Sequence, residues 1–264
     1  MKIYCIINII NLISKSSYIL KGILKHKMEI IKPIPIQLNM FDLRNERQKI
    51  NNLSAIESIK KCDLSKNINL RELDRILRYE LLNTTKEELL DECKNNHMMT
   101  TILGGRLAIN ASRQGTKDEE LQINTCNITS SKCGVIIEKL TSTAFRPTKS
   151  GEVVSNKQFK EKNLSKNDCL KSFDAKISGK VNGWIFAKVV IGDGGHQDNV
   201  FEEAHLFCEW VITYGNKEEL FVVLVDTNLY SKFHELREKY KNVSNILIGN
   251  HIEIQQHFID YYYV

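Results

Sequence analysis

The chain has 264 residues, of which 42% are hydrophobic and only three are proline, so it is long enough to bury a sizeable core and we expect it to be globular. Its 37 basic and 32 acidic residues give a net charge of +5, a mild excess that permits a nucleic-acid partner without requiring one. The seven cysteines are scattered and lack CxxC spacing, which argues against a zinc or redox motif and predicts reduced thiols in a cytoplasmic, intracellular protein.

The first residues, MKIYCIINIINLISKSSYILKGILK, combine a lysine with an apolar run that Asn8 and Asn11 interrupt. This run is far shorter than the ~20 residues that a membrane span needs, and no small-residue cleavage site follows it. We therefore expect no membrane association. Residues 1–40 are assigned as a leader whose status the sequence leaves open, with Met28 and Met40 as alternative starts.

Helical spacing dominates residues 41–98. Leucines and isoleucines recur three and four residues apart, and Thr85 with Glu88 forms a capping box. We predict a helical region over residues 41–98 and an α/β domain over residues 99–264. The stretch 97–112 can continue as a packed helix that Gly104 and Gly105 soften.

The middle of the chain is more polar. After SRQGTKDEELQ, the segment GVIIEKL is interpreted as a strand or a short buried helix. Residues 141–168 then form what we interpret as an excursion of long loops, a feature that is often functional in a compact domain. The basic residues of this excursion form either a DNA-clasping arm or a flexible solvated loop; they are Arg146, Lys149, Lys157, Lys160 and Lys162.

The C-terminal part alternates strands and helices. KSFDAKI and WIFAKVVIG, joined by SGKVNG, predict an antiparallel hairpin, and a helix is expected from about Asn199 to Tyr214. ELFVVLVDT and SNILIG have the continuous apolar character of strands buried on both faces, and SKFHELREKY and EIQQHFIDYYY are expected to be helices. The order predicts an α/β fold with a mixed central sheet flanked by helices.

Lys188 interrupts an otherwise apolar strand. Strand alternation places it on the same face as Trp184 and Phe186, where an ammonium group is costly without a partner or solvent. The paired strand offers Asp174, and the start of the following helix offers Glu202 and Glu203. Carboxylates that converge beside a lysine suit a divalent cation with oxygen ligands and, with it, phosphodiester hydrolysis.

This arrangement resembles the PD-(D/E)XK nuclease superfamily and, within it, the type II restriction endonucleases. The segment SFDAKI supplies Asp174 and the segment FAK supplies Lys188. The chain departs from the family pattern two residues before the lysine, where Phe186 replaces an acid. Some members of the family lack that acid and bring a glutamate from the following helix, a position that Glu202 matches. The resemblance covers about residues 170–264, with the helix before residue 120.

The resemblance implies a restriction endonuclease-like fold and Mg²⁺-dependent, sequence-specific hydrolysis of phosphodiester bonds in double-stranded DNA. It implies Asp174, Lys188 and Glu202 as catalytic residues, with Asp174, Glu202 and Glu203 as metal ligands. Glu119 is a further acid that the core helix can supply, as in some family members. A homodimer and, in a restriction–modification system, a cognate DNA methyltransferase encoded nearby would be the partners.

DNA contacts are expected from polar residues near the site. Arg and Gln side chains read base edges or hold phosphates, and His and Gln in the loop GDGGHQD can shape the site or touch DNA. The alternatives are a solvated helix end and an ordinary surface histidine. The residues assigned to DNA binding are Arg113, Gln114, Lys117, His196 and Gln197.

Simpler interpretations stay open. Asp174 and Lys188 can be an ordinary cross-strand ion pair, worth ~0.2–1 kcal/mol. Glu202 can complete a capping box with Asn199, which would leave Glu203 as a solvated first-turn acid. Two other functions follow: a non-catalytic DNA-binding protein on the same fold, with Phe186 marking a lost acid, or an unrelated α/β enzyme that binds a phosphorylated ligand at loop 192–198.

Overall fold

The computed structural model describes residues 32–64, 68–191 and 197–263, with the side chains of residues 197 and 198 excepted. Residues Pro33–Val264 form one compact unit. Most of the predicted leader, residues 1–31 with the alternative start Met28, lies outside the described residues.

The N-terminal helical region contains α2 (Met40–Lys60), α3 (Leu70–Tyr79), α4 (Lys86–Asn95) and α5 (His97–Leu107). The capping box predicted at Thr85 and Glu88 begins α4. Gly104 lets α5 approach α2 closely, because a Cβ at this position would meet Ile56 Cγ1 at 2.4 Å. The four helices share one apolar cluster that continues past the boundary predicted at residue 98; its members include Ile59, Leu73, Leu89, Leu103 and Leu107.

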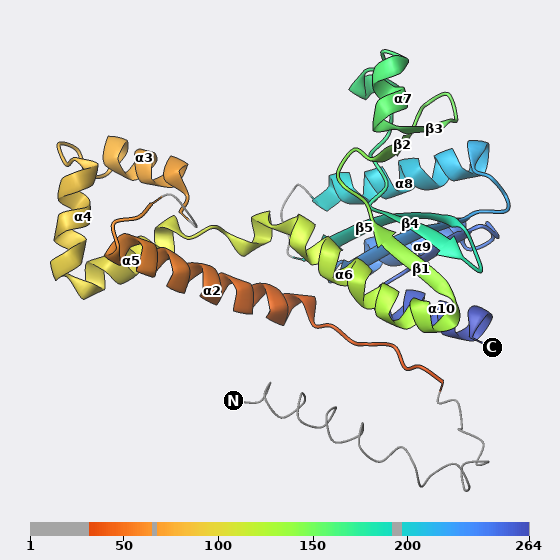
Figure 1. Ribbon diagram of the computed structural model, residues 1–264, viewed down its shortest axis with the longest axis horizontal. Coiled ribbons are helices and arrows are strands. Elements are labelled where there is room, and N and C mark those ends of the chain that lie inside the picture. The colour runs from red at the N-terminus through yellow and green to blue at the C-terminus, as the bar shows by residue number, and fades with distance from the viewer. Residues whose placement is uncertain (1–31, 65–67, 192–196, 264) are drawn as a thin grey trace, which may run out of the picture. The chain divides into compact units, whose positions relative to one another are not determined.

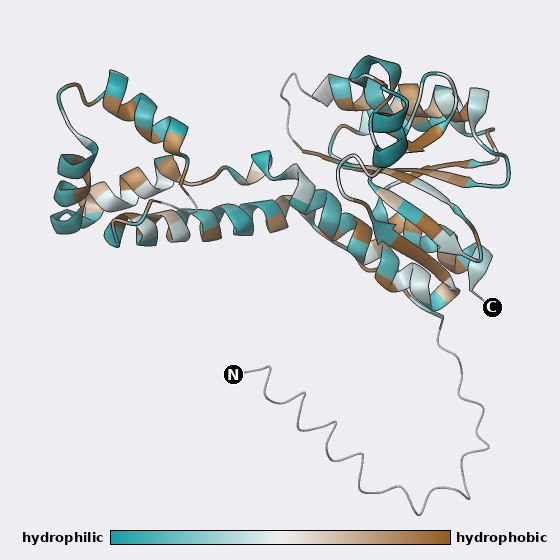
Figure 2. Cartoon of the chain, turned by 45° about the horizontal axis from the view of Figure 1, so that its top comes forward, coloured by the Kyte–Doolittle hydropathy of each residue, from teal (hydrophilic) through white to brown (hydrophobic). Residues whose placement is uncertain are grey.

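The α/β part is built on a mixed five-stranded sheet in the order β1 (Val135–Lys139), β4 (Ala175–Gly179), β5 (Gly183–Val190), β6 (Leu220–Thr227) and β7 (Ile246–Gly249). The first three strands pair antiparallel, and β5, β6 and β7 pair parallel. This confirms the α/β fold with a mixed central sheet. The strands are mostly hydrophobic, as Figure 2 shows, because helices cover both of their faces.

Helices form a layer on each side of the sheet (Figure 1). α6 (Gly115–Ser130) and α10 (His251–Tyr262) bury Ile123 and Phe258 against one face. α8 (Gln197–Tyr214) and α9 (Tyr230–Tyr240) bury Phe207 and Leu236 against the other. The helix expected from about Asn199 is thus α8, which begins at Gln197.

The polar excursion after residue 140 is more ordered than the long loops that the sequence predicts. It contains the two-stranded sheet of β2 (Phe145–Pro147) and β3 (Val153–Ser155), followed by α7 (Asn156–Glu161). Strands of three residues are too short to show alternation in sequence, which is why the prediction was wrong here. The Trp210 indole on α8 donates to the Thr148 carbonyl oxygen at 2.7 Å and holds the excursion on the α/β core.

Residues 33–39, which we call the N-terminal strap, run along α10. The Gln255 side chain accepts from the Ile36 amide at 2.8 Å and donates to the Ile36 carbonyl at 2.9 Å. The Leu38 amide donates to His251 Nε2 at 2.9 Å. A chain that started at Met40 would lack these bonds.

Two smaller predictions concern thiols and membranes. None of the six cysteines of the described chain takes part in a disulfide bond, and five of the six are buried. Within the described ranges, no helix has both the length and the apolar character needed to cross a bilayer.

Candidate functional site

Asp174 lies at the end of the sheet where β4 begins. Its amide donates to the Ile185 carbonyl, and its carboxylate Oδ2 accepts from the Ala187 amide at 2.9 Å. The carboxylate therefore takes the place of a backbone acceptor where the β4–β5 ladder stops. This local pairing fixes its position beside β5.

Lys188, on β5, gathers three oxygen atoms around its ammonium group. Nζ lies 2.7 Å from Glu119 Oε1, 2.8 Å from the Ala187 carbonyl oxygen and 3.4 Å from Asp174 Oδ2. Strand alternation predicted the meeting of Asp174 and Lys188 across the hairpin, and the structure brings them together. The three side chains are 16–19% exposed, so solvent still reaches a largely buried cluster.

The pKa shifts follow from this partial burial. Burial raises the pKa of the Glu119 carboxyl, with the ammonium of Lys188 acting against the shift. For Lys188 the desolvation that would lower its pKa is outweighed by Asp174 and Glu119, and the pKa of its ammonium group is raised. Lys188 is therefore a cation at neutral pH.

Glu119 comes from the first turns of α6. Glu119, Gln122 and Cys126 recur at helical spacing on the face of α6 that meets the sheet, and Gln122 Nε2 lies 3.4 Å from the Lys188 carbonyl oxygen. The start of α6 is fixed by buried Asp118, which binds Arg44 of α2 at 2.6 Å and Arg47 of α2 at 2.5 Å. The helical region thereby helps to position Glu119.

A buried polar network connects the site to the N-terminal strap. Gln122 Nε2 also donates to Asp226 Oδ2 at 2.6 Å, and the other oxygen of Asp226 lies 2.6 Å from His251 Nδ1. Because His251 Nε2 accepts from the Leu38 amide, Nδ1 carries the proton and donates to Asp226. Sequence reasoning missed this network, which joins segments far apart in the chain.

Phe186 occupies the position where the family pattern has an acid. Its side chain is buried and stacks on Phe207 with ring centroids 5.7 Å apart. It also lies under the Lys188 ammonium group, 5.1 Å from the ring centroid. Phe186 is therefore a core residue against α8.

The structure does not bring Glu202 and Glu203 to Lys188. Glu202 is exposed on α8, and Glu203 pairs with Lys171 at 3.3 Å. Within the described part of the chain, no hydrogen bond or ion pair joins either one to Asp174 or Lys188. Glu119 lies on α6, across the sheet from α8. The capping-box alternative also fails, because α8 begins at Gln197 and Asn199 lies inside it.

The structure describes the side chains of three of the five residues that are predicted to contact DNA. Arg113, at the end of the 3-10 turn Ala111–Arg113, and Lys117, in the first turn of α6, are both exposed. Gln114 accepts a hydrogen bond from Asn51 Nδ2 at 3.2 Å. His196 and the side chain of Gln197 lie outside the described residues.

The oxygen atoms around the Lys188 ammonium group are of the type that a hard cation prefers. The described residues contain no group of three or more His, Cys, Asp and Glu side chains that could hold a metal. Two carboxylates and one carbonyl oxygen nevertheless converge on a positive charge, and Mg²⁺ is commonly bound by one or two carboxylates together with substrate phosphates and water. Glu119 and Asp174 are the carboxylates that could be shared with such an ion, which would compete for them with the Lys188 ammonium group.

No protein-family model, no curated protein and no solved structure matches the chain.

Proposed function

We propose that this protein is a Mg²⁺-dependent endonuclease of double-stranded DNA, of the type II restriction class. The observation that carries the proposal is the convergence of Glu119, Asp174 and the Ala187 carbonyl on the Lys188 ammonium. Lys188 follows Asp174 on the next strand of a mixed sheet, in the order of the PD-(D/E)XK pattern. Glu119 takes the role that the sequence assigned to Glu202 or Glu203.

Each residue has a distinct role in this proposal. Glu119, Asp174 and the carbonyl of Ala187 would hold Mg²⁺, which when bound supplies a Lewis acid for a phosphoryl oxygen and lowers the pKa of its bound water. Lys188 carries an ammonium group whose pKa is raised by Asp174 and Glu119. In the proposal it donates hydrogen bonds that orient the attacking water and stabilise negative charge developing on the phosphate.

The remaining expectations rest on the resemblance. Arg113, exposed just before α6, and Lys117, exposed in its first turn, would contact the duplex near the scissile phosphate. A homodimer with two sites for the two strands, and a cognate methyltransferase encoded nearby, stay predictions.

The test is to incubate the protein with duplex DNA and Mg²⁺. We expect cleavage by the wild type, none by Asp174→Ala or Lys188→Ala, and wild-type rates for Lys132→Ala, which removes an exposed lysine on the 3-10 turn Ser131–Cys133. Binding of the duplex without cleavage would support the non-catalytic alternative, in which Phe186 marks a lost acid. Stabilisation by a nucleotide but not by duplex DNA would favour an unrelated enzyme.

A further inference from the structure

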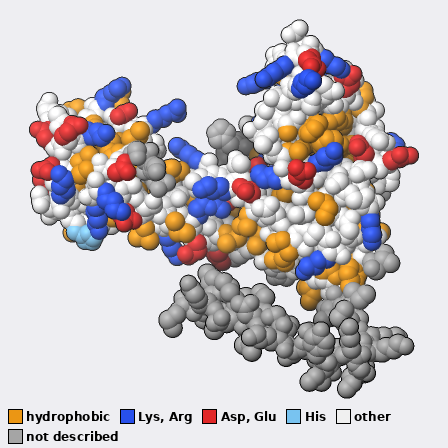
Figure 3. All heavy atoms as spheres, viewed as in Figure 1, with side chains coloured by type: hydrophobic (Ala, Val, Ile, Leu, Met, Phe, Trp, Pro, Cys, Tyr) orange, Lys and Arg blue, Asp and Glu red, His pale blue; other side chains and the backbone are white. Residues whose placement is uncertain are grey.

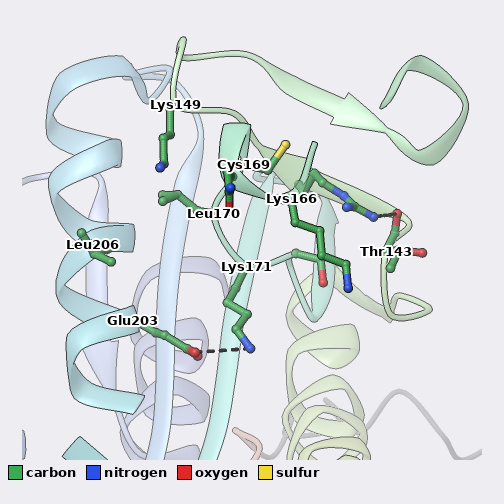
Figure 4. A pocket seen from close by; sticks show the side chains of 11 residues that line it. Thr143, Lys149, Lys166, Cys169, Leu170, Lys171, Glu203 and Leu206 are labelled. Carbon is green, nitrogen blue, oxygen red and sulfur yellow. Dashed lines mark hydrogen bonds and ion pairs between the residues drawn. The ribbon is translucent and has the colours of Figure 1, made fainter. Parts of the chain in front are cut away.

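A cavity lies between the polar excursion, with the residues that follow it, and α8. It has a volume of about 590 Å³, within the range of small-molecule sites. Four basic side chains line it, from Arg146, Lys149, Lys166 and Lys171, against the single carboxylate of Glu203. Figure 4 shows the labelled lysines around the pocket and the pairing of Lys171 with Glu203.

Arg146 is the unusual member of this set. Arg146 is only 9% exposed, and an arginine is seldom so buried without an acidic partner. Among the described residues it forms no ion pair, and its five N–H donors find one acceptor, the Thr143 carbonyl at 3.4 Å. Its Nε is buried without a hydrogen-bond partner in the described chain. The guanidinium therefore has donors available for a ligand.

Contacts with α7 and α8 position this arginine and the strand that carries it. Phe159 of α7 covers one face of the guanidinium, with the ring centroid 4.2 Å from Cζ. Thr148, two residues along the chain, is tied to α8 through Trp210. The cavity is therefore built by the same contacts that order the excursion, and Arg146 lines it with one face of its guanidinium against Phe159.

The charge of the other residues that line the cavity also favours an anionic ligand. Lys149 and Lys166 are exposed and form no ion pair with a carboxylate of the described ranges, and the nearby Asp168 carboxylate interacts with the Lys149 side chain only electrostatically. Over α7, by contrast, Figure 3 shows basic side chains next to acidic ones, in line with the ion pairs Lys157–Glu161 and Lys162–Glu152. Bidentate guanidinium donors next to mobile ammonium groups recognise phosphate. Leu170 and Leu206 give the cavity an apolar wall.

We propose that this cavity binds a nucleotide unit, with its phosphoryl group on Arg146, Lys149 and Lys166 and its sugar or base against Leu170 and Leu206. The unit comes either from a DNA strand or from a free nucleotide. Lys171 precedes Asp174 by three residues, so their Cα atoms lie at most ~10 Å apart. A strand held in the cavity would thus be close to the Asp174 site, although binding here does not depend on cleavage there.

The experiment measures binding in EDTA, so that it is independent of any cleavage. Deoxyadenosine monophosphate, deoxyadenosine and inorganic phosphate are titrated calorimetrically, and a duplex oligonucleotide is titrated at several salt concentrations. The variants are Arg146→Gln and the double variant Lys149→Gln/Lys166→Gln, whose exposed positions leave the fold intact. The control is Lys160→Gln, which removes one positive charge, as Arg146→Gln does, from an exposed lysine of α7 that does not line the cavity.

We expect the double variant to weaken binding at least tenfold in one of two arms. Loss of deoxyadenosine monophosphate binding identifies a free nucleotide as the ligand. A decrease of ~2 in the slope of log K against log salt for the duplex identifies a strand phosphate. Lys160→Gln should bind like the wild type in the free-nucleotide arm and lower the duplex slope by no more than ~1.

Three results would overturn the proposal. One is that the double variant and Arg146→Gln change neither nucleotide binding nor duplex binding more than the control Lys160→Gln does. Another is that deoxyadenosine binds as tightly as its monophosphate. Inorganic phosphate that binds as tightly as the monophosphate would contradict the role given to the apolar wall.

Discussion

Replacing Phe186 by glutamate tests whether this position is a residue of the hydrophobic core or the site of a lost catalytic acid. The side chain is 2% exposed and stacks on Phe207, so the substitution removes a packed ring and places a carboxylate in the same space. Loss of a buried Phe side chain costs about 3–5 kcal/mol, part of which the methylenes of Glu retain. An uncompensated buried carboxylate adds several kcal/mol. Lys188 offers limited relief, because it already binds three oxygens.

The sum of these effects is at least about 5 kcal/mol, comparable to the whole stability of a domain at about 5–15 kcal/mol. We therefore expect Phe186→Glu to be unfolded, or to melt more than about 10 °C below the wild type by circular dichroism. The matched control Phe186→Leu should cost about 1–2 kcal/mol and melt a few degrees lower. A Phe186→Glu protein with the melting temperature of the wild type and faster Mg²⁺-dependent cleavage would refute this reasoning.

Two further predictions concern stability. Burial raises the pKa of Glu119 in the folded state above the ordinary value of 4.5, so the folded state binds this proton more readily than the unfolded state. The contribution of Glu119 to stability therefore falls as the pH rises from the unfolded pKa to the folded pKa. Urea denaturation should therefore show the unfolding free energy of Glu119→Gln increasing relative to that of the wild type as the pH rises above about 4.5. A difference between the two proteins that does not change with pH would contradict the raised pKa. Removing residues 1–39 instead of residues 1–31 deletes three hydrogen bonds to Gln255 and His251, and should lower the unfolding free energy by about 2–4 kcal/mol. Equal melting temperatures for the two truncations would show that the N-terminal strap contributes nothing.

Part of the site was predictable because strands have a strict period. Alternation along β5 and the short turn to β4 place Asp174 beside Lys188, and the structure has them 3.4 Å apart. The apolar runs of β6 and β7 likewise predict buried parallel strands, which the sheet contains. Local patterns were sufficient wherever the interacting residues share one hairpin or one element.

The second carboxylate was not predictable in the same way. Glu119 lies 69 positions before Lys188, and only the packing of α6 on the sheet brings them together. From the sequence, the role of metal ligand was assigned to Glu202 and Glu203, which lie on the helix of the opposite layer, and Glu119 was named only as a further acid that the resemblance implies. One signal was present: Glu119, Gln122 and Cys126 share the buried face of α6, and an acid on such a face needs a cationic partner.

The excursion shows a different limit. Its basic residues appeared equivalent in sequence, as members of one arm or one solvated loop. Arg146 differs from them because Phe159 and Thr143 enclose it, whereas Lys149 and Lys160 are exposed. Burial of a charged side chain in a region of short strands depends on tertiary contacts, so composition could not distinguish it.

The central claim is that Glu119 supplies the second carboxylate of a metal-dependent nuclease site. Its most direct test compares the Mg²⁺-dependent cleavage rates of Glu119→Gln and of the double variant Glu202→Gln/Glu203→Gln on the same duplex. We predict a loss of about 100-fold or more for Glu119→Gln and a near-wild-type rate for the double variant. Full activity of Glu119→Gln, with loss of activity in the double variant, would contradict the account and return the role to the helix that follows β5.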